Sequence, residues 1–402
     1  MAEWSQLPRE LLDSIAKLLT SDIYVLRFRS VCSSWRSSVS YPLFYQLPNC
    51  IPIHPKVVTT SLSDLGVFYL SKRVILRLGL PENQQRRNFG TSWLIKLEQD
   101  VPGMLRLLNP LTENPIYPLP TTFPKIFDTI NFQISELGQE YVLRYTNKPP
   151  FTNQFGYSGD VYMEKVVFSS TPPWSVGIDY VIMTIHVSGK LAVFRSIDNS
   201  WTVIDDFTSP YDDVICYKGG FYAVDTTGRA VVVSPSLTVT EIASPVFGGE
   251  KKCLVESEGE LLLVDRYLSI GPDEDLGNVH DDEHIGQNDT YIVDSTIWFK
   301  VYKLNQGGQN WVELKSLGDR VLFLGDNCSF STSASDFTGC KGSCIYFTDM
   351  FVSLNKEEDD AFKACDIGVF NLEDGSIGPL MSYQDRSQLF WPPPAWISTV
   401  SF

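Results

Sequence analysis

A short pattern recurs along this chain: a glycine, any residue, four mostly apolar residues and then a charged residue. Copies stand at residues 189–195, 219–225 and 259–265, and a copy that is one residue longer stands at 342–349. Glycine permits a tight turn, and four consecutive apolar residues are typical of a short strand that is buried on both faces. The pattern therefore predicts repeated turn-and-strand units and limits the fold to architectures built from many short strands.

The spacing of these units predicts a mainly β fold. The glycines at positions 189, 219, 259 and 342 are spaced by 30, 40 and 83 residues, the last being roughly two periods, and a period of roughly 40 to 50 residues is typical of β-propeller blades. Hairpin signals lie between the copies at 198–200, 307–308 and 374–375, the last being the favoured Asp-Gly turn. Dividing about 340 residues by this period predicts six or seven blades. A pair of β-sandwiches or a barrel is the alternative fold.

The N-terminus differs, because residues 7–39 carry the strong helical pattern. Four aliphatic residues fall on one face of a first helix, namely Leu11, Ile15, Leu18 and Leu19. A second helix is expected from Ser21 or Asp22 through Arg29, with Ile23, Val25 and Leu26 facing inward. A third short helix should follow Cys32.

Three helices in about 40 residues carry more apolar surface than so small a unit can bury. A large exposed apolar patch usually marks a binding site for a partner. The pattern alone leaves open a second interpretation, in which the helices form a cap packed on the main domain.

The residues of this helical segment strongly resemble the F-box. The resemblance rests on Leu7-Pro8, Leu11-Leu12, Ile15 and the segment Val31-Cys32-Ser-Ser-Trp35-Arg36. It implies a three-helix F-box at residues 1–47 that binds a Skp-type adaptor and, through it, a cullin. The adaptor-contacting residues that it implies are Leu7, Pro8, Leu11, Leu12, Ile15, Val31, Cys32 and Trp35. For Trp35 above all, a place in the core of the helical unit remains an alternative.

The remainder of the chain resembles the plant F-box proteins that carry a KIB-type β-propeller, a SKIP-like family. The resemblance is carried by residues 107–111, 299–305, 312–319, 340–349 and 391–397. We therefore expect an F-box at 1–47, a proline-containing linker at 48–75 and a six- or seven-bladed β-propeller at 76–402. The insert at 271–290 matches no motif of that family, and the resemblance names no substrate.

No motif in the chain predicts catalysis, a metal or a cofactor. His280 and His284 have the spacing of two metal ligands on one helix face, but Gly271-Pro272 and Gly277 predict a solvated acidic loop there. The net charge of −16 argues against nucleic acid as the main partner. The N-terminus lacks a signal peptide, and no stretch reaches the roughly 20 apolar residues that span a bilayer. Eight cysteines at irregular spacing indicate reduced thiols, so we expect the nucleus, the cytoplasm or both.

The function that follows is recruitment instead of catalysis. We expect the substrate-recognition subunit of a Skp–cullin–F-box ubiquitin ligase, with the F-box on the adaptor and the propeller on a target protein. Two alternatives remain at this point: an F-box protein that acts outside a cullin ligase, and a propeller hydrolase.

Overall fold

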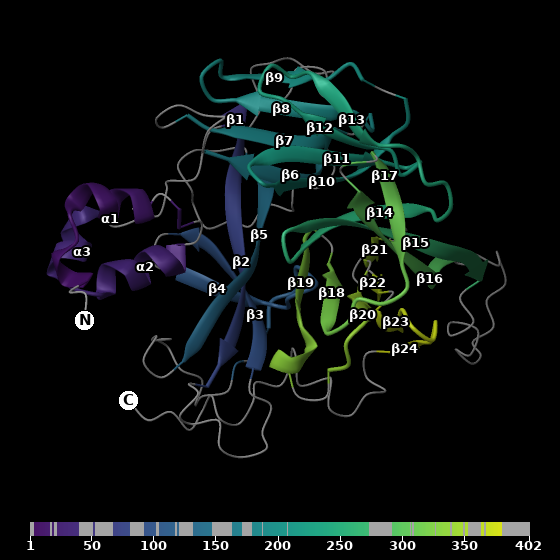
Figure 1. Ribbon diagram of the computed structural model, residues 1–402. Coiled ribbons are helices and arrows are strands. Elements are labelled where there is room, and N and C mark those ends of the chain that lie inside the picture. The colour runs from purple at the N-terminus through teal and green to yellow at the C-terminus, as the bar shows by residue number, and fades with distance from the viewer. Residues whose placement is uncertain are drawn as a thin grey trace, which may run out of the picture.

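The computed structural model shows an N-terminal helical unit beside a larger body of β-sheets (Figure 1). It describes residues 4–16, 18–19, 22–39, 51–52, 67–80, 92–101, 104–116, 119, 132–146, 163–170, 179–186, 188–206, 208–272, 292–305, 307, 309–325, 327–337, 340–348, 350–352, 363–365 and 367–379. The predicted insert at 271–290, beyond residue 272, and the C-terminal motif at 391–397 lie outside these ranges.

The helical unit contains the three predicted helices. It consists of a 3₁₀ turn, η1 (Trp4–Gln6), and the helices α1 (Arg9–Ala16), α2 (Asp22–Ser30) and α3 (Ser33–Ser38). The prediction that Leu18 continues the apolar face of α1 is wrong, because α1 ends at Ala16 and Leu18 is 78% exposed. The amide N–H groups of Leu18 and Leu19 donate to carbonyls three residues back, which turns the chain out of the α-helix.

Two side chains form the core of this unit. Leu12 is 1% exposed and Phe28 is 5% exposed, and the Phe28 ring lies 4.5 Å from the Trp35 ring. Leu26, which was predicted to face inward, is 38% exposed. The place expected for Leu26 is taken by Phe28, because the larger aromatic ring reaches α3 and removes more apolar area from water.

The strands account for most of the described chain. They are β1 (Ile51–Pro52), β2 (Val67–Gly79), β3 (Ser92–Val101), β4 (Met104–Leu108), β5 (Gln133–Thr146), β6 (Met163–Ser169), β7 (Val181–His186), β8 (Leu191–Arg195), β9 (Ser200–Val203), β10 (Tyr211–Tyr217), β11 (Gly220–Asp225), β12 (Ala230–Val233), β13 (Val239–Ala243), β14 (Lys251–Ser257), β15 (Glu260–Pro272), β16 (Ile292–Asn305), β17 (Asn310–Leu314), β18 (Arg320–Leu324), β19 (Ser329–Ser333), β20 (Cys344–Phe347), β21 (Met350–Val352), β22 (Lys363–Cys365), β23 (Gly368–Asn371) and β24 (Ile377–Pro379); a 3₁₀ turn, η5 (Ala334–Asp336), follows β19.

These strands form sheets arranged around a common centre. A nine-stranded sheet contains two successive meanders, β4-β3-β2-β5 and β6-β7-β8-β9, which are joined at the register pair Tyr141↔Val166. The next sheets are β10–β13, β14–β17 and β19-β18-β20-β23-β24, with β21 and β22 as a separate ribbon. One strand of each unit faces the centre, since β5, β6, β10, β14 and β19 follow one another as neighbours and β19 returns to β5.

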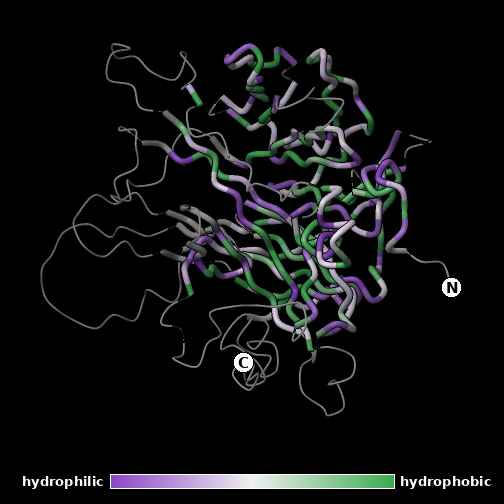
Figure 2. The backbone as a smooth tube through the Cα atoms, turned by 90° about the vertical axis from the view of Figure 1, so that its left-hand side faces the viewer, coloured by the Kyte–Doolittle hydropathy of each residue, from purple (hydrophilic) through white to green (hydrophobic). Residues whose placement is uncertain are grey.

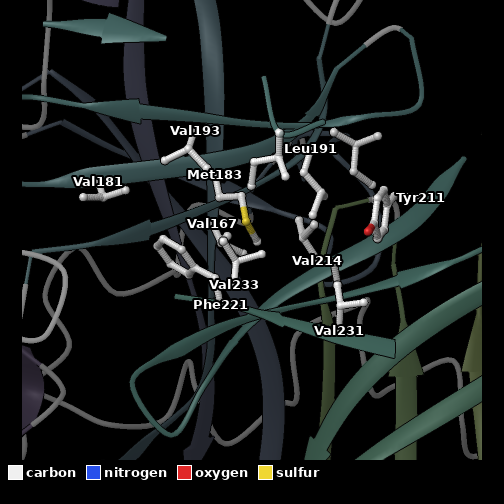
Figure 3. Close-up of a cluster of buried hydrophobic side chains, with 13 residues drawn as sticks. Val167, Val181, Met183, Leu191, Val193, Tyr211, Val214, Phe221, Val231 and Val233 are labelled. Atoms are coloured by element: carbon white, nitrogen blue, oxygen red, sulfur yellow. The ribbon is translucent and has the colours of Figure 1, made fainter. Parts of the chain in front are cut away.

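Hydrophobic cores fill the space between successive sheets. Figure 3 shows the core between β6–β9 and β10–β13, where Met183, Val193 and Phe221 are fully or almost fully buried. Equivalent clusters join β10–β13 to β14–β17 and β14–β17 to the last sheet. Figure 2 shows these strands as long hydrophobic stretches in the middle of the molecule. Each sheet is therefore covered on both faces, as the runs of apolar residues predict.

The last sheet packs against the first. Its Phe323 ring lies 4.8 Å from the rings of Phe330 and Tyr346, in a cluster that includes Ile75 of β2 and Leu94 of β3. The turn after β4 docks on the β18–β19 hairpin, where a Cβ on Gly325 would come within 2.5 Å of the Leu111 carbonyl oxygen. This close approach requires glycine at position 325.

The repeated turn-and-strand units are confirmed. Gly189, Gly219 and Gly259 have φ of 74°, 76° and 76°, and strands β8, β11 and β15 follow them. The ring of sheets is the arrangement of a β-propeller preceded by helices, as predicted. The described residues supply five such units, if the two meanders of the nine-stranded sheet are counted separately, and the ribbon β21–β22. The blade number of six or seven stays a prediction. Residues 51–52 and 67–75, inside the predicted linker 48–75, are strands.

Candidate partner-binding surface

The helical unit is anchored to the propeller through α2. Ile23 packs against the buried cluster that contains Leu76, Leu78 and Trp93 of the first sheet. The Arg27 guanidinium donates a hydrogen bond to the carbonyl oxygen of Ile134 at the start of β5. Figure 1 shows α2 next to the strands, with α1 and α3 on the outer side. The surface available to a partner therefore belongs to α1, α3 and η1.

This outer surface is apolar. Leu11 is 52% exposed, Val31 is 54% exposed and Trp4 is 64% exposed. The Trp35 indole Nε1–H donates to the carbonyl oxygen of Trp4 at 2.9 Å, which holds η1 against α3. Exposed aliphatic and aromatic side chains on so small a unit are typical of a protein-binding surface.

The eight residues implied by the F-box resemblance divide into three groups. Pro8, Leu11 and Val31 are exposed, whereas Leu7, Ile15, Cys32 and Trp35 are partly buried. Leu12 is 1% exposed and cannot offer its side chain to a partner in this structure. The Leu12 side chain lies in the core and supports the helix that presents Leu11, and direct contact of Leu12 with an adaptor stays a prediction.

Four further large hydrophobic residues of the described helical unit are exposed and were not among the predicted contacts. They are Trp4, Leu18, Tyr24 and Leu26. A signal for Trp4 was present in the sequence, since a tryptophan in the otherwise polar segment Ala-Glu-Trp-Ser has no apolar pattern to bury it. Leu18 was misread because it fits the apolar face of a longer first helix, and Leu26 because it fits the apolar face predicted for the second helix.

A buried charge cluster on the first sheet, next to the last sheet, is the second candidate site. Arg73 of β2 donates to the carboxylates of Glu98 (2.8 Å, β3), Glu113 (2.6 Å) and Glu140 (β5). Lys96 reaches Glu140 at 3.0 Å. Burial disfavours each charge, yet the opposite charges outweigh it: the pKa of Lys96 is raised, mainly by Glu140, and the pKa of Glu140 is lowered, mainly by Lys96 and Arg73.

Arg73, Lys96, Glu98 and Glu140 are charged and paired with one another, so the cluster serves structure more than chemistry. Burial raises the pKa of the nearby Cys328 thiol to about 12 and that of Cys253 to about 11, so both thiols stay protonated at neutral pH. Glu113 also accepts from the Asn327 amide at 2.8 Å, which ties the cluster to the last sheet. Among the described residues there is no group of three or more His, Cys, Asp or Glu side chains that could hold a metal ion. None of the described helices is long and apolar enough to cross a membrane.

Comparisons with known proteins match both parts of the chain. Residues 4–47 match the model of the F-box domain, and residues 67–371 match that of the KIB1-4 β-propeller. The chain is similar to F-box protein SKIP23 of Arabidopsis thaliana, with 43% identity over 99% of this chain and 96% of that protein. It is also similar to F-box protein At2g17036 of the same plant, with 34% identity over 99% and 96% of the two chains. A solved structure, a mutant Synechocystis apocarotenoid oxygenase, aligns at 9% identity and a TM-score of 0.27 over 77% of this chain and 91% of the other, from which we infer nothing.

Proposed function

Because this chain belongs to the family of F-box proteins with a KIB1-4 β-propeller, we propose that it is the substrate-recognition subunit of a Skp–cullin–F-box ubiquitin ligase. The F-box binds the Skp-type adaptor, the adaptor binds the cullin, and the propeller binds the protein to be ubiquitinated. The chain itself performs no chemical step. It acts in the nucleus, the cytoplasm or both.

The observation that carries this proposal is the orientation of the helical unit. The propeller packs against α2 through Ile23 and Arg27, while Leu11, Val31 and Trp4 remain exposed. An adaptor can therefore bind α1 and α3 without displacing the propeller. The propeller stays available for a second protein at the same time.

The gain from such an arrangement is proximity. Holding a target beside the ubiquitin-conjugating enzyme raises the effective concentration of its lysines near the thioester. A receptor that is packed against its F-box keeps this placement more constant than one on a flexible tether, since a tether spreads the target over a larger volume.

The test is reconstitution of the full-length protein with a Skp-type adaptor and a cullin. We expect one complex on size-exclusion chromatography and adaptor binding in a calorimetric titration. Replacing both Leu7 and Pro8 with Ala should weaken adaptor binding by about 2 kcal/mol. The matched propeller variant Ile197→Ala changes a side chain that is 73% exposed in the β8–β9 turn and should leave the affinity unchanged.

Two results would contradict the proposal. Unchanged binding of the Leu7/Pro8 variant would remove these residues from the interface. Binding of the adaptor with exclusion of the cullin would favour an F-box protein that acts outside a cullin ligase.

A further inference from the structure

Exposed apolar side chains gather at the outer rim of the propeller, between the sheet β14–β17 and the last sheet. Ile297 and Trp298 of β16 are 54% and 42% exposed, and Ile377 of β24 is 43% exposed. The Trp298 ring meets the buried Phe370 ring edge to face at 5.2 Å. Ile377 is the register partner of Phe370, so both side chains lie on the same face of that sheet. Trp298 and Ile377 therefore border the same spot.

The backbone on both sides of this spot is shaped to present these side chains. The register of β15 and β16 shifts at Tyr267/Leu268, and this irregularity leaves Ile297 without a cross-strand partner. On the other side, the turn between β23 and β24 contains Gly375 with φ of 70°. A Cβ at position 375 would come within 2.2 Å of the Trp298 ring, so the ring lies directly over the turn.

The same turn contains two carboxylates, Glu373 and Asp374, directly before Gly375 in the chain. Hydrogen bonds from Ser316 and Ser376 lower the pKa of Glu373 and of Asp374 respectively, so both are ionised at neutral pH. Lys341 is the cation whose charge acts on both carboxylates, which leaves the turn net negative. The charge of the whole propeller has the same sign. Residues 1–47 hold five basic and four acidic residues, a net charge of +1, so the rest of the chain must carry −17 to give the total of −16.

We propose that this rim patch, defined as Ile297, Trp298, Ile377, Glu373 and Asp374, binds a segment of the target protein in which Lys or Arg lies next to a large apolar side chain. The exposed tryptophan face and the two carboxylates attract the cation. Ile297 and Ile377 supply the apolar area for its neighbour. An acidic segment would be repelled by the same carboxylates. That the partner is a ligase target rests on the proposed function.

The location of the rim patch fits a target-binding surface. Figure 1 shows β16 and β24 on the side of the propeller that is opposite to α1, α2 and α3. An adaptor on the helices and a protein segment on the rim patch can therefore be bound together without contact between them.

The experiment selects peptides from a phage-displayed random library of about twelve residues against the full-length protein bound to its adaptor. Enriched peptides should carry Lys or Arg within a few positions of a large apolar residue. Trp298→Ala should weaken binding of the selected peptide about tenfold or more, and Ile297→Ser about threefold. Replacing Glu373 with Gln and Asp374 with Asn should weaken binding and abolish its salt dependence. The matched control is Ile197→Ser, an exposed isoleucine of another sheet, and should bind as the unchanged protein does.

Three results would each overturn this proposal. The first is that no peptide is enriched, and the second is that the enriched peptides lack basic residues. The third is that Trp298→Ala and Ile297→Ser bind the selected peptide as tightly as the unchanged protein does. If Trp298→Ala lowers the melting temperature, the binding of Ile297→Ser decides the test instead, because Ile297 is exposed whereas Trp298 packs on Phe370. Adaptor affinity is titrated for every variant and should stay constant. If the unchanged protein does not bind the adaptor, the proposed function is contradicted, whereas the peptide-binding role of the rim patch is not.

Discussion

The helical unit and the propeller solve the problem of burial in different ways. Among the described residues of 4–39, only Leu12 and Phe28 are buried. In the propeller, by contrast, every residue of β7 and of β20 is buried, because each sheet lies between two others. A ring of sheets hides both faces of its strands, whereas three short helices leave apolar side chains in water. Stability is therefore concentrated in the propeller, and the helical unit keeps an apolar surface for a partner.

The two regions also handle charge differently. The propeller buries charged side chains completely, with Arg73 and Lys96 both at 0% exposed and Glu98 at 1%. The cost of removing these groups from water is offset by mutual pairing, and an unpaired member would carry that cost alone. Substitution of one member should therefore have the largest effect on stability in the molecule.

The first prediction breaks the charge cluster. Arg73→Met should lower the unfolding free energy of the propeller by about 3–5 kcal/mol, because Glu98, Glu113 and Glu140 lose their shared cation. The matched control is Arg195→Met, since Arg195 pairs with Asp198 at 2.8 Å on the surface, where loss of the pair should cost less than about 1 kcal/mol. Denaturant unfolding followed by tryptophan fluorescence measures both variants. Equal losses would show that the buried cluster contributes no more than a surface pair.

The second prediction separates core from surface within the helical unit. Leu12→Ala should destabilise this unit by about 2–3 kcal/mol, because it opens a cavity beside Phe28. Leu11→Ala, at the neighbouring exposed position, should change its stability by less than about 0.5 kcal/mol yet weaken adaptor binding about tenfold. Hydrogen exchange of the α1 amides reports stability, and a calorimetric titration reports affinity. Weaker adaptor binding by Leu12→Ala with unchanged exchange would support direct contact for Leu12.

Local sequence patterns predicted the repeating part of the propeller well. Glycines followed by apolar runs, as at Gly219 and Gly259, specify a turn and a doubly buried strand within seven residues, and both became β-strands in the expected places. The helices were predicted for the same reason, since their signal lies within a few turns. The difference between the neighbours Leu11 and Leu12 was not predicted, because packing against the other helices decides which side of α1 is covered.

The buried charges were not predicted, because their pattern is ambiguous in sequence. Lys96 and Glu98 alternate with Ile95 and Leu97 in β3, which is the pattern of a strand with one face in water. The ring covers that second face as well, and the charges find partners on β2 and β5. The contact between Glu113 and Asn327 joins residues 214 positions apart. No local pattern contains such a distant pairing.

The third prediction tests the joint between the two regions. Arg27→Ala removes the hydrogen bond to the Ile134 carbonyl and should loosen the helical unit by about 1 kcal/mol, measured as faster hydrogen exchange in α2. Adaptor affinity should stay within about twofold, because α2 faces the propeller. Arg195→Ala, a surface arginine of β8, is the control for loss of an arginine. A fall in affinity as large as that of Leu11→Ala would place α2 in the adaptor interface.

The smallest effect is expected from pH, and it should act on the propeller alone. Asp212 of β10 accepts a hydrogen bond from the Lys252 amide of β14 at 2.9 Å, between two neighbouring sheets. Burial raises the pKa of Asp212 to about 6 from its ordinary value of 3.8, despite that bond. The native state thus holds this proton to higher pH than the unfolded chain does. The contribution of Asp212 to stability therefore falls as the pH rises from about 4 to about 6 and is constant above.

Asp212→Asn removes this dependence, because the amide oxygen still accepts from Lys252 but carries no charge. Discounted for the partial exposure of Asp212, the variant should be more stable than the unchanged protein by about 1 kcal/mol near pH 7.5, and the difference should shrink toward zero near about pH 4. The lowered pKa values of Glu98 and Glu140 affect both proteins equally and cancel in this difference. Thermal unfolding at the two pH values measures it, with hydrogen exchange in α1 as the helical reference that should not change. A variant that is less stable near pH 7.5 would mean that the ionised Asp212 is stabilised by its lysine neighbours, so that the charge, and not only the acceptor oxygen, holds the two sheets together.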